Sequence, residues 1–115
     1  MFHAITPVVR CPNIDDVRAF YCDQLGFSVA FEHRFGPSYP LYVGLQRDGL
    51  SLHLSEHAND GSPGAVIRIE VADLHTFHAG LTLASLPAVE VQPWGFKELM
   101  LRDPAGNRIV FVQRT

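Results

Sequence analysis

The sequence predicts an α+β fold made of two copies of a strand–helix–strand unit. Each half contains one short amphipathic helix that follows a strand, and the two helices open on related segments, DVRAFY at residues 16–21 and DLHTFH at residues 73–78. A second pair of related segments follows, RDG at residues 47–49 and RDP at residues 102–104. A pattern repeated in this way indicates an internal duplication.

The first half alternates between apolar segments and turn formers. A strand is expected over residues 5–10. Asn13 with Asp16 resembles a capping box that opens a helix, and this helix is expected to end at Gly26. Strands are expected over residues 27–33, 41–46 and 50–55, and the last two form a hairpin around Asp48-Gly49. The helix is expected to lie on a sheet with one apolar stripe, which consists of Ile14, Val17, Phe20, Tyr21 and Leu25.

The second half repeats this plan after a polar stretch rich in turn formers at residues 56–64. A strand is expected over residues 65–71, then a helix capped by Asp73, then strands over 89–91, 97–101 and 109–113. We therefore expect a single domain over residues 1–115. Its N-terminal module spans about 4–56, a linker about 57–64, and its C-terminal module about 65–115.

Composition narrows the range of partners. The chain has 115 residues, of which 47% are hydrophobic and 18% charged, which is enough apolar surface for one core without long disordered segments. A net charge of -3 without a cluster of Lys and Arg argues against nucleic acid. No apolar run exceeds five residues and the start lacks a secretion signal, so we expect no membrane partner and a cytoplasmic location. Cys11 and Cys22 lack a CxxC spacing and are expected to be reduced.

Alternation along the strands predicts a polar groove. Side chains on one face of each sheet are expected to cover the helix, namely Ile67, Ile69 and Val71 in one half and Leu50, Leu52 and Leu54 in the other. The opposite faces then carry Val66, Arg68 and Glu70, and Ser51, His53 and Ser55. Two such faces side by side form a trough, and apolar walls with a few polar groups are typical of a small-molecule site.

Three motifs are similar to the glyoxalase/bleomycin-resistance/extradiol-dioxygenase superfamily. They are DVRAFYCDQLGF at residues 16–27, QPWGFKE at 92–98 and RDPAGNRIVFV at 102–112, and the second is similar to the bleomycin-resistance branch in particular. The resemblance covers nearly the whole chain. It implies paired βαβββ modules that form two half-open sheets around a groove. It also implies a homodimer with two equivalent grooves built from both subunits.

Metal-dependent members of this superfamily carry four ligands, whose positions fall here on Thr6, His53, Val66 and Val110. Only His53 can bind a metal, whereas a catalytic site for a divalent ion needs at least three protein ligands. We therefore expect no metal and no cofactor. His75 and His78 lie three apart on the second helix and are interpreted as surface residues.

The resemblance also implies which residues hold a ligand. In the bleomycin-resistance proteins, a Trp and an aromatic residue clasp the flat tail of the drug, and the matching positions here are Trp94 and Tyr42. A planar ligand between two rings gains about 0.5–1.5 kcal/mol for each well-placed aromatic contact. The alternative is that Trp94 belongs to the core. Further candidates are the polar His53, Ser55, Ser51, Arg68 and Glu70 and the aromatic Phe96, Tyr39, Phe31 and Phe35, although Phe31 is in phase with Phe27 and Val29 and is equally consistent with the core.

The main hypothesis is a metal-independent, homodimeric binding protein without catalytic residues, which sequesters a bleomycin-type antibiotic or another planar ligand. An inward Arg68 would instead favour an anionic or neutral ligand. The first alternative is an enzyme of the same superfamily, either metal-dependent or using His53 and Glu70 as acid and base, that acts on a small carbonyl or aromatic metabolite. The second alternative is a structural or regulatory dimer with an empty groove.

Overall fold

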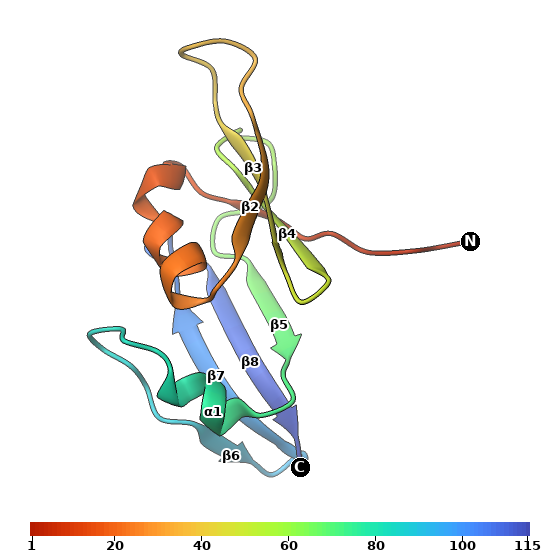
Figure 1. Cartoon of the computed structure of the whole chain (residues 1–115), viewed down its shortest axis with the longest axis vertical. Coiled ribbons are helices and arrows are strands. Elements are labelled where there is room, and N and C mark those ends of the chain that lie inside the picture. The colour runs from red at the N-terminus through yellow and green to blue at the C-terminus, as the bar shows by residue number, and fades with distance from the viewer.

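The computed structural model describes all 115 residues and contains two four-stranded sheets of the same topology (Figure 1). The first sheet has the order β1-β4-β3-β2, with β1 Val8–Arg10, β2 Ser28–His33, β3 Tyr42–Arg47 and β4 Leu50–Ser55. The second has the order β5-β8-β7-β6, with β5 Val66–Glu70, β6 Glu90–Gln92, β7 Phe96–Arg102 and β8 Arg108–Arg114. In each sheet the first strand pairs in parallel with the last, and the other pairs are antiparallel. The predicted fold class is confirmed.

Short helices connect the first two strands of each module. They are η1 Ile14–Asp16 and η2 Ala19–Gln24 in the first module and α1 Leu74–Ala79 in the second. The Asn13 side chain caps η1 by accepting a hydrogen bond from the Asp15 N–H at 3.1 Å, but Asp16 does not complete the expected capping box. The Leu25 N–H bonds to the Phe20 carbonyl five residues back, so η2 has the wide turn of a π-helix.

The start of the helical segment is held in the same way in both modules. The Glu56 carboxylate, just after β4, accepts hydrogen bonds from the Ile14 N–H at 2.8 Å and the Leu41 N–H at 2.9 Å. Near the end of β8, the Gln113 side-chain oxygen accepts one from the Leu74 N–H at 2.7 Å. The repeat seen in the sequence therefore extends to the hydrogen bonds that anchor each helical segment.

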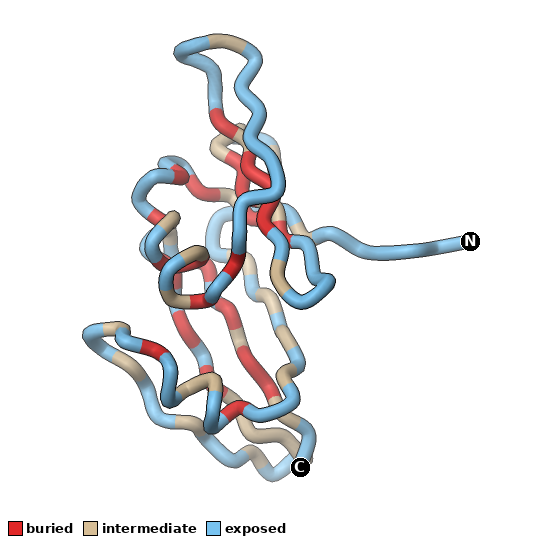
Figure 2. Tube along the Cα trace, viewed as in Figure 1, coloured by how far each residue is buried: buried red, intermediate tan, exposed pale blue.

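One cluster of 19 buried hydrophobic residues includes members from both modules, and it contains the whole predicted stripe of the first helix (Figure 2). Leu52 and Leu54 are buried in it as expected. Leu50 is not, because it lies at the tip of the β3–β4 hairpin, where 49% of its surface remains exposed.

The turn at residues 103–107 joins the two modules. Tyr21 donates its hydroxyl hydrogen to Asp103 Oδ2 at 2.5 Å, and the Asn107 amide donates to the same oxygen at 2.9 Å and to the Arg10 carbonyl at 3.0 Å. The Asn107 Oδ1 accepts a hydrogen bond from the Ala65 N–H at 3.0 Å. Asp103 and Asn107 are both buried, so the RDPAGN motif has a structural role at the junction of the modules.

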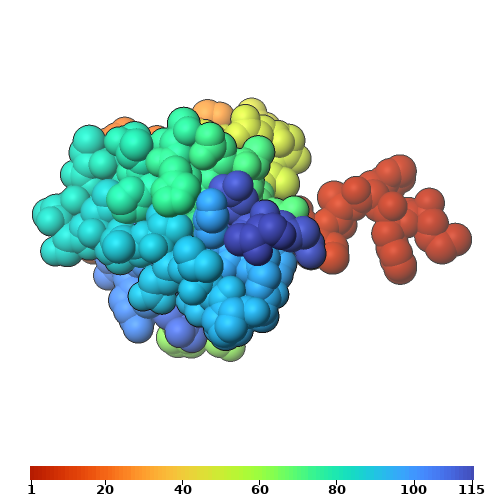
Figure 3. All heavy atoms as spheres, turned by 90° about the horizontal axis from the view of Figure 1, so that it is seen from below, coloured from red at the N-terminus to blue at the C-terminus, as the bar shows by residue number.

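The N-terminal residues project from the body of the protein (Figure 3). A strand was expected over residues 5–10, but β1 begins only at Val8, and 93% of the Ile5 surface is exposed. The strand does not extend to Pro7 because proline lacks an N–H, although the Pro7 carbonyl still accepts a hydrogen bond from the His53 N–H at 3.0 Å. No helix in the chain has the length and apolar character that crossing a membrane requires.

Candidate functional site

The face of the first sheet that points away from the helices carries an aromatic cluster of Phe31, Tyr42 and His53, which we call the first-sheet cluster. The Phe31 and Tyr42 rings are stacked, with centroids 6.2 Å apart and an interplanar angle of 14°. His53 meets both rings edge-on, at centroid distances of 5.2 Å from Phe31 and 5.3 Å from Tyr42. Aromatic pairs favour such offset and edge-to-face arrangements.

A β-bulge explains why Phe31 belongs to this cluster. The pairing of β2 with β3 shifts between Val29 and Phe31, so Val29 lies opposite Leu45 while Phe31 lies opposite Gly44 on the other face. A Cβ atom on Gly44 would come within 2.1 Å of the Phe31 ring, so the ring lies over the bare backbone of β3. The core role that the phase with Phe27 suggested for Phe31 is therefore wrong, because the extra residue reverses the alternation.

Tyr42 and His53 are also joined by a hydrogen bond. The Tyr42 hydroxyl lies 2.7 Å from His53 Nδ1, and both side chains are half-buried. Burial raises the pKa of the Tyr42 hydroxyl, and the nearby Asp60 carboxylate adds to the effect. Tyr42 therefore stays protonated well above neutral pH and presents a fixed ring with a defined polar edge.

The other candidates on the first module differ in accessibility. Ser51 is exposed near the start of β4, and Tyr39 lies in the β2–β3 loop with 58% of its surface exposed. Ser55 is on the expected face but fully buried, where its hydroxyl donates to Asp60 at 2.8 Å and accepts from the His57 N–H at 3.1 Å. The hydrogen-bonding capacity of Ser55 is thus already used inside the first module.

The open face of the second sheet carries a second-sheet cluster of Arg68, Trp94, Phe96 and Glu98. Trp94 lies in the turn between β6 and β7 with 61% of its surface exposed, and its indole N–H donates to Glu98 Oε2 at 3.2 Å. Arg68 donates to the same oxygen at 3.0 Å, and its guanidinium lies 5.7 Å from the Phe96 centroid. Because Trp94 is exposed, the alternative that it belongs to the core is wrong.

Glu70 adjoins this cluster on β5. Its carboxylate pairs with Arg114 at 3.2 Å, and the Arg114 guanidinium lies 5.0 Å from the centroid of the Phe96 ring. Phe96 is thus approached by two arginines, each paired with a carboxylate. The open face of the second sheet thus combines an exposed indole with two ion pairs next to Phe96.

The chain does not bring the two clusters together. No aromatic contact, hydrogen bond or ion pair joins them, and none of the three main clefts is lined by residues of both. The two modules pack through their helices and the 103–107 turn, which leaves the two clusters apart, although one cleft between the modules is lined by Ser51, Arg68 and Glu70 together. Each module carries only half of the expected site.

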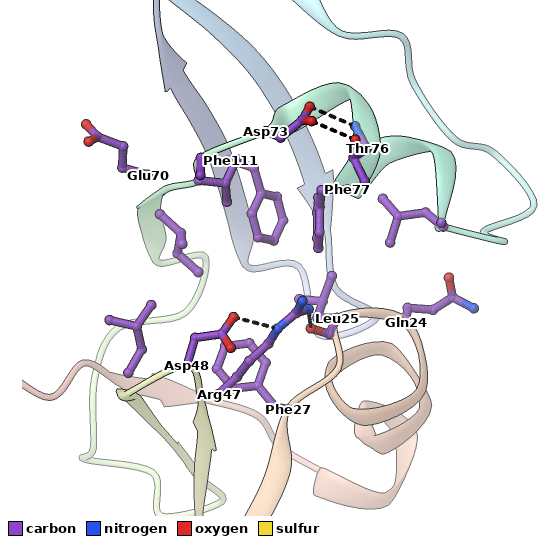
Figure 4. A pocket seen from close by; sticks show the side chains of 16 residues that line it. Gln24, Leu25, Phe27, Arg47, Asp48, Glu70, Asp73, Thr76, Phe77 and Phe111 are labelled. Carbon is purple, nitrogen blue, oxygen red and sulfur yellow. Dashed lines mark hydrogen bonds and ion pairs between the residues drawn. The ribbon is translucent and has the colours of Figure 1, made fainter.

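The largest of the three clefts lies on the helix side, between the modules (Figure 4). It has a volume of about 650 Å³, and Phe77 and Phe111 face Arg47 and Phe27 across it. The Arg47 guanidinium lies 5.8 Å from the Phe77 centroid and bonds to the Leu25 carbonyl at 2.5 Å and to Asp48 at 3.1 Å. Among the predicted site residues only Glu70 lines this cleft, so it is separate from both clusters.

The four positions that match metal ligands do not form a metal site. Val66 and Val110 occupy two of the four positions, and neither side chain can bind a metal. No group of three or more His, Cys, Asp or Glu side chains is placed to hold a metal ion. The donor set of this chain does not fit the metal of the metal-dependent relatives.

The structure thus consists of two half-open sheets built from paired βαβββ modules, with aromatic groups on their open faces. The model of a family described as glyoxalase superfamily protein matches residues 1–115, and the chain belongs to this superfamily. It matches no curated protein in sequence.

Solved structures agree with this assignment. A bleomycin resistance determinant encoded on the transposon Tn5 is 25% identical, with a TM-score of 0.74 and 98% of each chain covered. The bleomycin-binding protein of bleomycin-producing Streptomyces verticillus, solved with copper(II)-bleomycin, is 26% identical, with a TM-score of 0.69 and coverage of 96% of this chain and 95% of that one. A member of the glyoxalase/bleomycin resistance protein/dioxygenase superfamily from Sphaerobacter thermophilus has a TM-score of 0.75 at 19% identity and covers 99% of this chain and 98% of its own.

Proposed function

We propose that this chain is a homodimeric binding protein that sequesters a planar small molecule, such as a bleomycin-type antibiotic, without metal or catalysis. The observation that carries the proposal is that each module presents a hydrogen-bonded aromatic group on an open sheet face, the half-buried Tyr42 in the first module and the exposed Trp94 in the second. The structural relatives that bind bleomycin support this choice of ligand.

A second copy of the chain would complete the site. In the proposed dimer, the first-sheet cluster of one subunit faces the second-sheet cluster of its partner, and a planar ligand lies between Tyr42 and Trp94. The two-fold symmetry of a dimer then produces two equivalent grooves. Ser51, Tyr39 and Glu70 are placed at the edges of the two half-sites and would orient polar parts of the ligand.

Fluorescence titration tests the binding proposal directly, since Trp94 is the only tryptophan. Metal-free and copper-loaded bleomycin should each quench it saturably at one ligand per subunit. Tyr42→Ala should abolish saturation, whereas Tyr42→Phe keeps the ring and should retain most of the affinity. Trp94→Phe removes the fluorophore, so calorimetry should be used for that variant. Absence of saturable binding at high micromolar bleomycin would reject the antibiotic as a ligand.

The dimer and the absence of metal are tested separately. Sedimentation velocity should give a mass near twice 12.8 kDa at micromolar concentration, and a monomer would refute the shared groove. Elemental analysis should find less than one metal ion per dimer, and treatment with EDTA should leave the titration unchanged. The two cysteines are free, which supports a reducing, cytoplasmic location as part of the same proposal.

One observation favours an enzyme as the second candidate. The hydrogen bond between Tyr42 and His53 places a hydroxyl and an imidazole together on an open face, and such a pair can transfer protons. The pair of His53 and Glu70 considered from the sequence is not formed within one chain, because Glu70 lies on the second sheet and pairs there with Arg114. Proton exchange of dihydroxyacetone in D₂O, followed by NMR, should exceed the buffer rate and fall in His53→Ala if this candidate is correct; exchange at the buffer rate would reject it.

A further inference from the structure

Glu98 is the residue through which Trp94 and Arg68 interact. It lies on β7, and its side chain is only 14% exposed although it is charged and on the open face. The same oxygen, Oε2, accepts the indole N–H of Trp94 at 3.2 Å and an Arg68 N–H at 3.0 Å. A single carboxylate oxygen therefore fixes the edge of the exposed ring and pairs with the nearest cation.

The pair of Arg68 and Glu98 also spans a strand. Arg68 lies opposite Val110 and Glu98 opposite Val112 on either side of β8, so the ion pair crosses the open face of that strand. Val112 is only 4% exposed although its register places it on this face. The two side chains thus form a fixed cover on the sheet beside Trp94.

The charges next to Phe96 are paired, although the face as a whole is not neutral, because the register also places Arg102, Arg108 and Glu90 on it. Two arginines, Arg68 and Arg114, are each paired with one carboxylate, Glu98 and Glu70, so the four groups sum to zero. Without the Glu98 charge they would sum to +1, and the unpaired cation would be Arg68, the arginine next to Trp94.

We propose that Glu98 is the positioning and charge-specificity residue of this site: it fixes the indole of Trp94 and neutralises Arg68, so that the groove favours anionic planar ligands less than it would with an unpaired Arg68. This inference rests on the proposed function for the role of Trp94 in stacking. Glu98 acts as the counter-ion of Arg68 and so removes the preference for anions that an unpaired Arg68 would impose.

Charged quenchers test the proposal without any ligand, because Trp94 is the only fluorophore of its kind. In Glu98→Gln, release of Arg68 should raise quenching by the anion iodide about twofold relative to the cation caesium, with acrylamide as the neutral reference. Glu98→Ala should in addition lower the fluorescence anisotropy of Trp94, because the ring loses its anchor. Iodide-to-caesium ratios and anisotropies equal to those of the wild type would overturn the inference.

Glu90→Gln is the matched control. Glu90 lies directly opposite Glu98 on β6, is exposed, and bonds only to Gln92, so its substitution removes an equal charge close to Glu98. The control should leave the anisotropy unchanged and shift the quencher ratio less than Glu98→Gln. An equal effect of both substitutions would show that general surface charge acts here and would refute a specific role for Glu98.

A pair of planar ligands then tests the specificity. Proflavine is a tricyclic cation and 9-anthracenecarboxylate a tricyclic anion, and calorimetry should show that Glu98→Gln weakens the first and strengthens the second about fivefold each. Unchanged relative affinities would overturn the charge-specificity claim. If the wild type binds neither probe and no bleomycin, the proposed function fails, while the quencher experiment still decides the role of Glu98.

Discussion

The contact between Phe31 and Gly44 can be tested by a double-mutant cycle. In Gly44→Ala the new methyl group meets the Phe31 ring at 2.1 Å, so the ring must move by about 1.5 Å to restore a normal carbon–carbon contact of about 3.5 Å. That movement disrupts the stack on Tyr42 and the edge contact with His53, each worth about 0.5–1.5 kcal/mol. Replacing a strand glycine returns about 0.5–1 kcal/mol, so the expected net loss is about 1 kcal/mol.

The sign should reverse when the ring is absent. In the Phe31→Ala background nothing opposes the methyl group, so Gly44→Ala should stabilise the protein by about 0.5–1 kcal/mol. The resulting coupling free energy is about 1.5–2 kcal/mol, a difference of about 1 M in urea midpoint for a slope of about 1.5 kcal/mol/M.

Urea unfolding of the wild type, both single variants and the double variant measures this coupling. Phe31 is 43% exposed, so its truncation should leave the fold intact and the cycle interpretable. A coupling below about 0.5 kcal/mol, the usual limit for independent sites, would show that Phe31 does not lie on Gly44 and would remove the first-sheet cluster as described.

Two further predictions concern stability. Asn107→Ala removes the three hydrogen bonds that link Ala65, Arg10 and Asp103, and should lower the unfolding free energy by about 2–4 kcal/mol and the Tm by about 10–15 °C. Calorimetry should show almost no change for the exposed Asn59→Ala, and a loss below about 3 °C in Asn107→Ala would contradict the role of the turn. Burial raises the pKa of the Cys11 thiol to about 12, with Asp103 adding to the effect, whereas the unfolded thiol titrates near 9.0. The folded state thus retains a proton that the unfolded state loses, so stability should fall as pH rises from about 9 to 12; equal slopes for the wild type and Cys11→Ala in urea unfolding would refute this.

Much of the fold could be predicted because local patterns carry it. The apolar stripe from Ile14 to Leu25 has helical spacing. Alternation along β5 places Arg68 and Glu70 on one face of the sheet and Ile67 and Ile69 on the other. Both patterns depend only on the period of the element that contains them. The duplicated motifs then allow one half to support the interpretation of the other.

The features that were missed depend on contacts between distant segments. Phe31 lies on the open face of the first sheet because β2 bulges against β3, and nothing in residues 28–33 alone shows where the pairing shifts. Glu98 and Glu56 act through partners that only the turn geometry and the chain packing bring to them. The Trp-x-x-x-Glu spacing at 94–98 could have indicated the contact of Glu98 with Trp94, since residues four apart can meet across a tight turn at the end of a strand.

The separation of the two half-sites within one chain has a genetic consequence. Under the proposed pairing, each groove takes Tyr42 from one subunit and Trp94 from the other, so a chain with Tyr42→Ala and a chain with Trp94→Phe are each inactive alone. When they are produced together, every mixed dimer contains one groove with both substitutions and one with neither. Two defective alleles would therefore complement each other and restore half of the binding capacity in mixed dimers, whereas two alleles altered in the same module would not.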